Sequence, residues 1–248
     1  MLTVNREILA DIPCLVLQDD DSTASPLLLY YHGWTSHKGD VNAPDGILVE
    51  AASAGFTVIA PDCAEHGERR TDAWSRATFN GWAFIMELGN QTRLEAPALL
   101  DAALALPNTT AMNPQVTGIS MGGVIAQLVF AQDKRWASLV SIVGRSSFYQ
   151  ADPWCRKAQE GTWCDAFCAE HATQSHPERF VDRPLLFLDG GQDTDCPAAT
   201  NTETVRLINN AGGQAQQYID ESVGHNFSPS MKQRYMTWVI AHKNGQGI

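Results

Sequence analysis

The segment QVTGISMGGVIAQLVF, residues 115–130, decides the fold class. Its first five residues form a short run that is typical of a buried strand, and from Val124 the apolar residues recur at helical spacing. Between them lies Gly-x-Ser-x-Gly, with Ser120 at its centre. A reactive serine on so sharp a turn needs glycine neighbours, because side chains there would collide with the strand and the helix. The segment therefore predicts a nucleophilic serine or, alternatively, a tight turn with a capping serine.

Short apolar runs recur on both sides of this segment and alternate with helical patterns. They are LLLYY (27–31), FTVIA (56–60), SLVSIV (138–143) and PLLFL (184–188). Strands that helices cover on both faces lose the alternation of apolar and polar residues. We therefore expect an α/β fold with a mostly parallel central sheet of about eight strands and helices on both faces. At the start of the chain, LTVNREIL and PCLVLQ predict an antiparallel hairpin at the sheet edge.

Two helices have clear signals. The apolar stripe of Leu99, Ala103 and Leu106 predicts one of them. The last helix of the chain is predicted to begin with Ser228 as N-cap and Pro229 as its first residue, where a missing N–H does no harm.

The chain is expected to form a single domain over residues 1–248. This length is ordinary for one α/β domain, and no Pro/Gly/Ser-rich linker divides the sequence. Residues 144–180 are longer than a simple crossover between two strands, so we predict a small cap insertion there. Its aromatic residues either line a substrate pocket or pin the insertion onto the sheet.

The charge balance argues against two classes of partner. Lys and Arg number 17 against 28 Asp and Glu, a formal net charge of -11, which repels nucleic acid and anionic membrane surfaces. Arg6 and Glu7 interrupt the place where a signal peptide needs an apolar core, and no run reaches 18 apolar residues. We therefore expect a cytoplasmic protein without nucleic-acid or membrane partners. The sequence carries no signal for an oligomeric state.

The six cysteines are too sparse for a disulfide scaffold, so free thiols are expected. Cys155, Cys164, Cys168 and His171 lie close together in the sequence, but their spacing is not a familiar zinc pattern. We expect thiols packed under a surface segment, and neither a metal nor an organic cofactor.

A reactive serine needs a base and an orienting acid, which in serine hydrolases built on such a sheet follow it in the order acid, then base. After PLLFL comes a loop with Asp193, which we predict as the acid. Asp195 and Asp189 are its competitors, and a turn-forming role is the alternative for all three. His225 follows the edge-strand pattern QAQQYID and is predicted as the base. Both loops would then lie at the same sheet edge as Ser120.

Two backbone groups complete the predicted site. His32, Gly33 and Trp34 directly follow the strand LLLYY, where such hydrolases place the loop that completes an oxyanion hole. We predict that the backbone N–H groups of Trp34 and Met121 face the developing negative charge, each contributing about 3 kcal/mol.

Several of these segments together resemble one family. They are REILADIPCLVL, YYHGWTSHKGD, VIAPDCAEHGER, GISMGG, DRPLLFLDGGQDTDCP and VGHNF, which span nearly the whole chain. The chain is similar to the α/β hydrolases, and among them to the small bacterial carboxylesterases of the YjfP type, in the dienelactone-hydrolase and prolyl-oligopeptidase-like group. The resemblance implies the α/β-hydrolase fold, no cofactor, and the roles predicted above for serine, acid, base and oxyanion donors. The pair Asp189-Gly190 departs from the usual His-Gly of the family.

The expected activity is that of a serine carboxylesterase that forms an acyl-enzyme intermediate. Small, short-acyl esters are the expected substrates, because a cap of fewer than 40 residues encloses only a modest pocket. A peptidase or amidase, or a thioesterase, is the alternative among enzymes. The alternative from another class is a non-catalytic binding module on the same fold, although such a module would usually have lost one of the three catalytic side chains.

Overall fold

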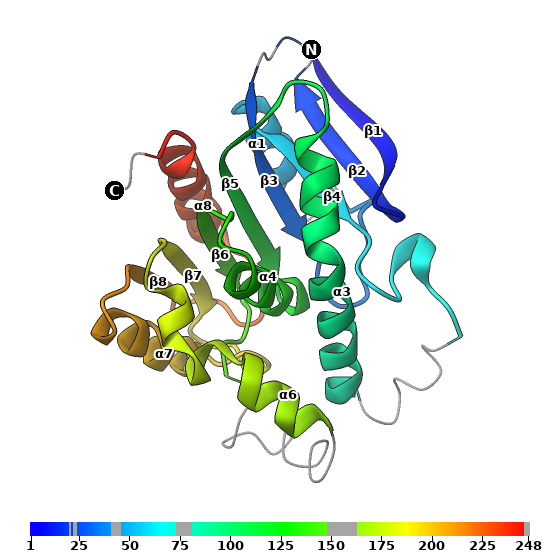
Figure 1. Ribbon diagram of the computed structural model, residues 1–248. Helices are drawn as coiled ribbons and strands as arrows, with labels where there is room; N and C mark the ends of the chain where they lie inside the picture. Colours follow the sequence, from blue (N-terminus) through cyan, green and yellow to red (C-terminus); the bar gives the residue numbers. More distant parts are fainter. Residues whose placement is uncertain (20, 22–23, 41–45, 73–80, 148–162, 246–248) are drawn as a thin grey trace.

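A single mixed sheet forms the centre of the molecule in a computed structural model (Figure 1). The structure describes residues 1–248 except 20, 22–23, 41–45, 73–80, 148–162 and 246–248. Across the described residues the sheet has eight strands in the order β1-β2-β4-β3-β5-β6-β7-β8. Their bounds are β1 Leu2–Leu9, β2 Ile12–Asp19, β3 Ser25–Tyr31, β4 Thr57–Pro61, β5 Thr109–Ile119, β6 Ser138–Ile142, β7 Leu185–Gly190 and β8 Ala215–Asp220. The expected fold class is confirmed.

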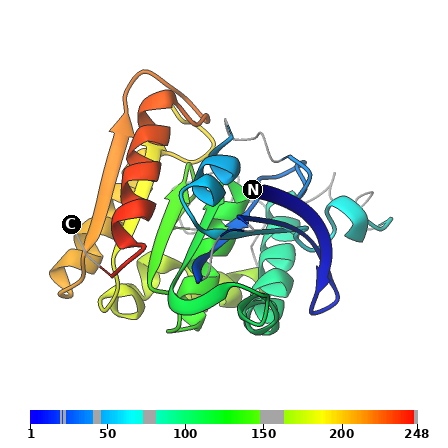
Figure 2. The ribbon, with the colours of Figure 1, turned by 90° about the horizontal axis from the view of Figure 1, so that it is seen from above.

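Strand β2 is the antiparallel member of the sheet. It pairs antiparallel with β1 and with β4, whereas the pairs from β4 across to β8 are parallel. The hairpin predicted at the start of the chain is therefore confirmed. Figure 2 shows β1 and β8 at the two opposite edges of the sheet. The parallel strands bring their carboxyl ends, and the loops that follow, to one common edge.

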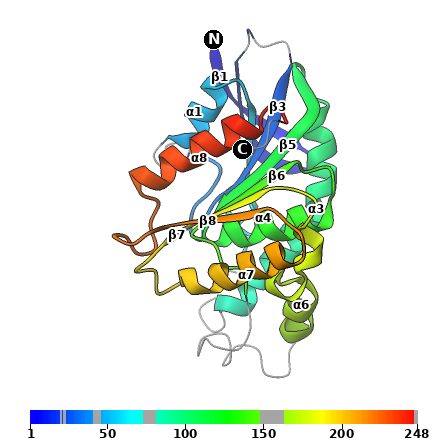
Figure 3. The same ribbon diagram turned by 90° about the vertical axis from the view of Figure 1, so that its left-hand side faces the viewer.

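Helices cover both faces of the sheet, as Figure 3 shows. Helices α1 (Ile47–Ser53) and α8 (Pro229–His242) lie on one face, and α3 (Gly81–Leu104), α4 (Met121–Gln132) and α7 (Ala198–Asn210) lie on the other. Helix α6 (Trp163–His171) follows on this second side. Three 3-10 turns are η1 (Gly67–Arg69), η2 (Thr173–Ser175) and η3 (Pro177–Phe180). Within the described ranges, no helix combines the length and apolarity needed to cross a bilayer.

Strand β3 shows why the central runs are apolar throughout. Leu27 and Leu29 belong to the core cluster under α3 and α4, whereas Leu28 and Tyr30 belong to the cluster under α1 and α8. All four side chains are buried. A strand with helices on both faces therefore needs apolar residues at consecutive positions, which is the pattern that the sequence shows.

The structure contains both predicted helices, and only for the last one was a start predicted from the sequence. Helix α8 begins at Pro229, and the side-chain oxygen of Ser228 accepts a hydrogen bond from the backbone N–H of Met231 at 3.3 Å, as expected of an N-cap. Helix α3 begins far upstream at Gly81 and ends before Leu106. It continues through Pro97, which usually ends a helix. Packing of its buried face against the sheet and α4 outweighs the hydrogen bond that the proline removes.

Part of the predicted cap lies outside the described residues. Residues 148–162, with three of the six Phe, Tyr and Trp residues of that segment, are not described. The described part consists of the loop after β6, helix α6 and the turns η2 and η3. In α6, Phe167 packs with Met86 of α3 and Val124 of α4. This side chain thus pins the segment onto the helical layer, which was one of the two roles considered for its aromatic residues.

Candidate active site

Ser120 lies on the turn between β5 and α4, in a backbone conformation that side chains rarely adopt. Its φ is 55° and its ψ is -117°. The neighbouring glycines permit the turn. A Cβ added to Gly118 would lie 2.1 Å from the carbonyl oxygen of Gly122, and one added to Gly122 would lie 2.0 Å from that of Tyr31. Backbone atoms cannot yield at such distances, so the glycines are required for the strained turn that presents Ser120.

Replacing Gly122 with alanine is therefore expected to lower the free energy of unfolding by about 3 kcal/mol or more, which corresponds to a fall in Tm of about 6–12 °C. The change in Tm is measured by thermal unfolding, with circular dichroism as the signal. Gly89→Ala is the matched control, because Gly89 lies inside α3 and a Cβ there makes an ordinary contact at 3.5 Å with Leu128 of α4. The control is expected to keep or raise Tm, since alanine favours a helix over glycine by about 1 kcal/mol. Equal Tm values for the two variants would contradict this account of the turn.

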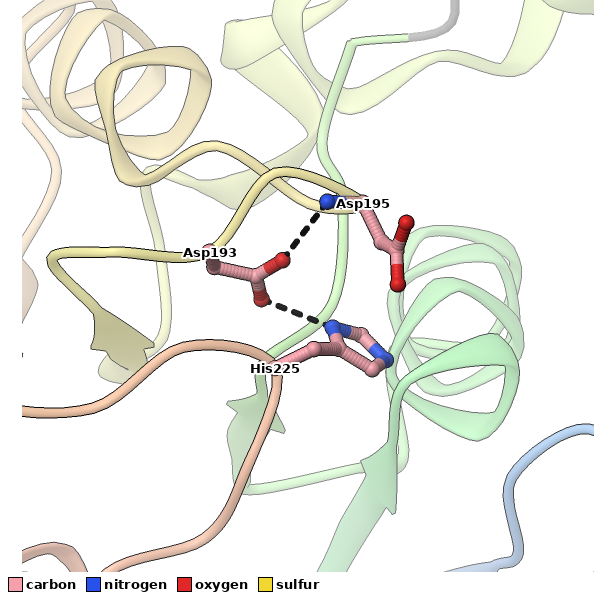
Figure 4. A group of neighbouring side chains, drawn as sticks. All are labelled: Asp193, Asp195 and His225. Atoms are coloured by element: carbon pink, nitrogen blue, oxygen red, sulfur yellow. Dashed lines mark hydrogen bonds and ion pairs between the residues drawn. The ribbon is translucent and has the colours of Figure 1, made fainter.

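A chain of hydrogen bonds joins Ser120 to a buried carboxylate. The Ser120 hydroxyl and His225 Nε2 lie 2.8 Å apart. His225 Nδ1 lies 2.7 Å from Asp193 Oδ2, as drawn in Figure 4. With the ring proton on Nδ1, the imidazole donates to Asp193 and accepts from Ser120. The Asp193 side chain is fully buried, and that of His225 is partly exposed. The hydrogen bond to Asp193 raises the pKa of His225 above its ordinary value, although burial of the ring opposes the shift.

Asp193 is held by its own loop. Its second carboxylate oxygen, Oδ1, accepts the backbone N–H groups of Asp195 and Cys196, each at 2.8 Å. Both oxygens therefore have partners, and the carboxylate cannot rotate away from His225 without losing them. Figure 4 shows that the side chain of Asp195 takes no part in these bonds. Of the three acids considered from the sequence, Asp193 is the one that contacts His225.

Asp189 belongs to a different network. Its buried carboxyl group accepts hydrogen bonds from Asn201 Nδ2 and Gln217 Nε2, both at 2.8 Å. Burial raises the pKa of Asp189 to about 7. Asn201 also donates to the carbonyl oxygen of Gly144, so this network ties strands β7 and β8 to α7 and the loop after β6. Asp189 thus supports the sheet edge beneath the site.

Two sets of side chains bear on metal binding. Among the described residues, Asp193, Asp195 and His225 are the one group whose ligand atoms all lie within 4.8 Å of one another. Asp193 and His225 are already hydrogen-bonded to each other, so a cation between them would have to replace that bond. Of the cysteine and histidine group considered from the sequence, Cys155 and the side chain of Cys164 lie outside the described residues. Cys168 is buried.

The loop after β3 is fixed by a buried histidine. The backbone N–H of Cys63 donates to His32 Nε2 at 3.1 Å, which leaves the ring proton on Nδ1 to donate to the carbonyl oxygen of Gly33 at 2.9 Å. Burial lowers the pKa of His32 to about 4, so the ring is neutral at pH 7. The C=O and N–H of a trans peptide point in opposite directions. Holding the Gly33 carbonyl therefore also sets the direction of the Trp34 N–H.

A buried ion pair fixes the same loop further along. Lys38 Nζ lies 2.5 Å from Asp62 Oδ2, and the Lys38 backbone N–H donates to Asp62 Oδ1 at 2.9 Å. Both side chains are buried. Sequence reasoning missed this pair and the role of His32. The ion pair could have been suspected from the position of Asp62, which directly follows β4 at the sheet edge where the other site loops also meet.

Ser120 opens onto a cavity of about 910 Å³. Trp34 and Met121, the two residues predicted to supply oxyanion donors, line it together with His225. Met121 is the first residue of α4, where a backbone N–H has no partner within the helix. The structure thus brings together all five residues predicted for the site.

The match to a family model covers most of the chain. The model described as the prolyl oligopeptidase family matches residues 49–242, which include Ser120, Asp193 and His225. The chain belongs to the prolyl oligopeptidase family. The part of the chain before residue 49, with β1, β2 and β3, lies outside the match.

Two relatives of this member of the prolyl oligopeptidase family match its sequence over most of their own length. The chain is 28% identical over 225 residues to a protein named Esterase YjfP from Escherichia coli (strain K12), covering 86% of this chain and 87% of that protein. It is 22% identical over 262 residues to the Putative esterase YitV of Bacillus subtilis (strain 168), covering 96% and 98%. The crystal structure of TT1662 from Thermus thermophilus has a TM-score of 0.78 and 20% identity over 99% of both chains. This last similarity shows the α/β-hydrolase fold alone.

Proposed function

We propose that the protein is a serine carboxylesterase that hydrolyses small, short-acyl carboxylic esters through an acyl-enzyme intermediate. The observation that carries the proposal is the continuous chain of hydrogen bonds from Ser120 through His225 to Asp193, at the wall of an open cavity. The full-length similarity to Esterase YjfP supports ester chemistry over other reactions of the family. The three side chains are the nucleophile, the base and the orienting acid of the proposed reaction.

The first half of the reaction acylates the serine. Ser120 Oγ attacks the ester carbonyl carbon while its proton passes to His225 Nε2. The carbonyl π electrons move onto the oxygen, which the backbone N–H groups of Trp34 and Met121 stabilise. When the tetrahedral intermediate collapses, the bond to the alkoxy oxygen breaks and His225 returns the proton to it. An alcohol leaves, and the acyl group stays on Ser120.

The second half repeats these steps with water. His225 takes a proton from water, the hydroxyl oxygen attacks the acyl carbon, and the bond to Ser120 Oγ breaks. The proton returns to Ser120, which restores the free serine and releases a carboxylic acid. Asp193 keeps the ring proton of His225 on Nδ1 and stabilises the cation that forms twice per turnover. The overall reaction consumes only the ester and one water molecule, and it releases an alcohol and a carboxylic acid.

The substrate range is tested with p-nitrophenyl esters from acetate to decanoate beside the matching p-nitroanilides. We expect ester hydrolysis to fall with acyl length and the anilides to react much more slowly. At about 910 Å³ the cavity lies in the upper part of the range of about 300–1,000 Å³ that ligand sites occupy, so the expected preference for short acyl chains rests on the small cap predicted from the sequence and not on the cavity volume. Faster hydrolysis of anilides would support an amidase or peptidase, and faster hydrolysis of matched thioesters a thioesterase. A folded protein without any turnover would support the binding module.

The pH dependence follows from His225, which must be neutral to accept a proton from Ser120. Its pKa lies above the ordinary value of 6.5 because the ring donates a hydrogen bond to Asp193. We therefore expect kcat/KM to decline as the pH falls, with a midpoint above 6.5. Initial rates in buffers of constant ionic strength between pH 5 and 9 measure this, with circular dichroism at each pH as the control for folding. Full activity retained at pH 5 would contradict the role of His225 as base.

A further inference from the structure

Asp195 brings an unpaired negative charge to the cavity of the proposed active site. It lines this cavity, and its side chain is exposed. Within the described ranges, no ion pair or side-chain hydrogen bond to its carboxylate is found. No lysine or arginine is among the residues that line the cavity. Asp195 is therefore the one permanent charge on this described wall.

The backbone of Asp195 is held in place although its carboxylate is free. Its N–H donates to Asp193 Oδ1 at 2.8 Å, and its carbonyl oxygen accepts from Arg145 Nη1 at 3.3 Å. The Arg145 guanidinium is the nearby positive group, and it is buried and also donates from Nε to the carbonyl oxygen of Ser147 at 3.0 Å. The cation thus anchors the backbone of two loops, after β6 and after β7, and leaves the carboxylate of Asp195 to the cavity.

The position of Asp195 relative to His225 indicates which part of a bound ester lies near the Asp195 carboxylate. One oxygen of its carboxylate, one ring nitrogen of His225 and one oxygen of Asp193 all lie within 4.8 Å of one another. In the proposed mechanism His225 gives its proton to the leaving alkoxy oxygen, which must therefore come within hydrogen-bond distance of the ring. The first few atoms of the leaving alcohol consequently lie close to Asp195.

We propose that the site prefers esters whose leaving alcohol carries an ammonium group, with Asp195 as the residue that determines this specificity. The inference rests on the proposed esterase function and names its substrate class. Two further observations agree with it. The aromatic rings of Trp34 and Phe227 line the same cavity, and aromatic faces attract alkylammonium groups. The net charge of -11 also draws cations towards the protein.

The test compares two acetate esters of nearly identical shape. Acetylcholine carries a quaternary ammonium group in its alcohol, and 3,3-dimethylbutyl acetate has a carbon atom in its place. For each variant we take the ratio of the two kcat/KM values, measured by acetate release, so that the difference in intrinsic reactivity cancels between variants. Asp195→Asn is expected to lower this ratio about tenfold relative to the wild type, because one charge contact in a partly solvated cavity is lost.

Glu221→Gln is the matched control. It removes one negative charge from an exposed side chain on the loop after β8 that does not line the cavity, and it is expected to keep the wild-type ratio. Raising the salt concentration to 1 M is expected to lower the ratio more in the wild type than in Asp195→Asn, since salt screens the attraction of the net charge in both proteins and the contact with Asp195 in the wild type alone. A merely structural role of Asp195 would not produce this difference.

The outcomes separate the inference from the proposed function. A ratio that stays the same in Asp195→Asn, or falls equally in Glu221→Gln, overturns the inference. So does a wild-type protein that hydrolyses p-nitrophenyl acetate with Ser120 intact but neither of the two alkyl acetates. If p-nitrophenyl esters also fail to react in the folded wild type, the proposed esterase function fails, and the inference with it.

Discussion

Ser120→Ala is expected to lower kcat/KM for p-nitrophenyl acetate by on the order of 10⁶-fold. The substitution removes Oγ, the atom that would bond to the acyl carbon and the one that lies 2.8 Å from His225 Nε2. It keeps the Cβ, so the strained turn and its glycine neighbours keep their geometry. Steady-state rates measured at high enzyme concentration detect the residual activity, and thermal unfolding shows that the variant is folded.

A second variant at the same position separates chemistry from stability. Ser120 has a φ of 55°, and a side chain in this region costs about 1–2 kcal/mol relative to glycine. Ser120→Gly is therefore expected to unfold at a higher temperature than the wild type and to be as inactive as Ser120→Ala. A phosphonofluoridate should label the wild type on the peptide that contains Ser120 and leave both variants unlabelled. Normal turnover by either variant would show that another residue is the nucleophile.

Asp193→Asn is expected to lower kcat/KM by about 10⁴-fold. The asparagine can keep its oxygen on the backbone N–H groups of Asp195 and Cys196, which fixes the loop as before. Its NH₂ group then faces His225 Nδ1, where the aspartate accepted a hydrogen bond. Two donors cannot share that position, so the ring proton moves to Nε2. The imidazole then has no lone pair for the proton of Ser120.

The matched variant Asp195→Asn should retain kcat/KM for a neutral ester within about tenfold, because its carboxylate does not bond the ring. Its negative charge also contributes to the raised pKa of His225, so the acid midpoint of its pH profile is expected to move to lower pH. The same assay, run in parallel on both variants, distinguishes the two acids. A larger loss in Asp195→Asn than in Asp193→Asn would reverse their assignment.

Much of the fold could be predicted because burial on two faces leaves a strong pattern. The runs around β3, β4, β6 and β7 are apolar at consecutive positions, and each became a strand with core on both sides. Ser120 could be predicted because its turn admits only glycine at Gly118 and Gly122, which leaves a short and specific motif. The start of helix α3 left no clear signal in the sequence, and the helix continues through Pro97, which opposes a helix locally, because tertiary packing outweighs it.

The sequence favoured Asp193 as the acid but left Asp195 and Asp189 as competitors. Asp193 and Asp195 share one loop, and both are residues that turns favour. What separates them is the backbone bend that lets Asp193 accept two N–H groups of its own loop while facing His225. The buried pair of Lys38 and Asp62 joins segments that are distant in the sequence. Such contacts leave no periodic pattern, because each depends on the meeting of two loops.

The three side chains of the site come from loops after three different strands, and this bears on how the protein refolds. Ser120 and His225, which share a hydrogen bond, are 105 positions apart in the sequence. Parallel strands pair slowly, because long loops must close before their contacts form. Recovery of ester hydrolysis after dilution from denaturant should therefore lag behind recovery of the circular dichroism signal of the helices. The enzymatic rate would then report the step of assembly at which the loops after β5, β7 and β8 meet and His225 reaches the serine.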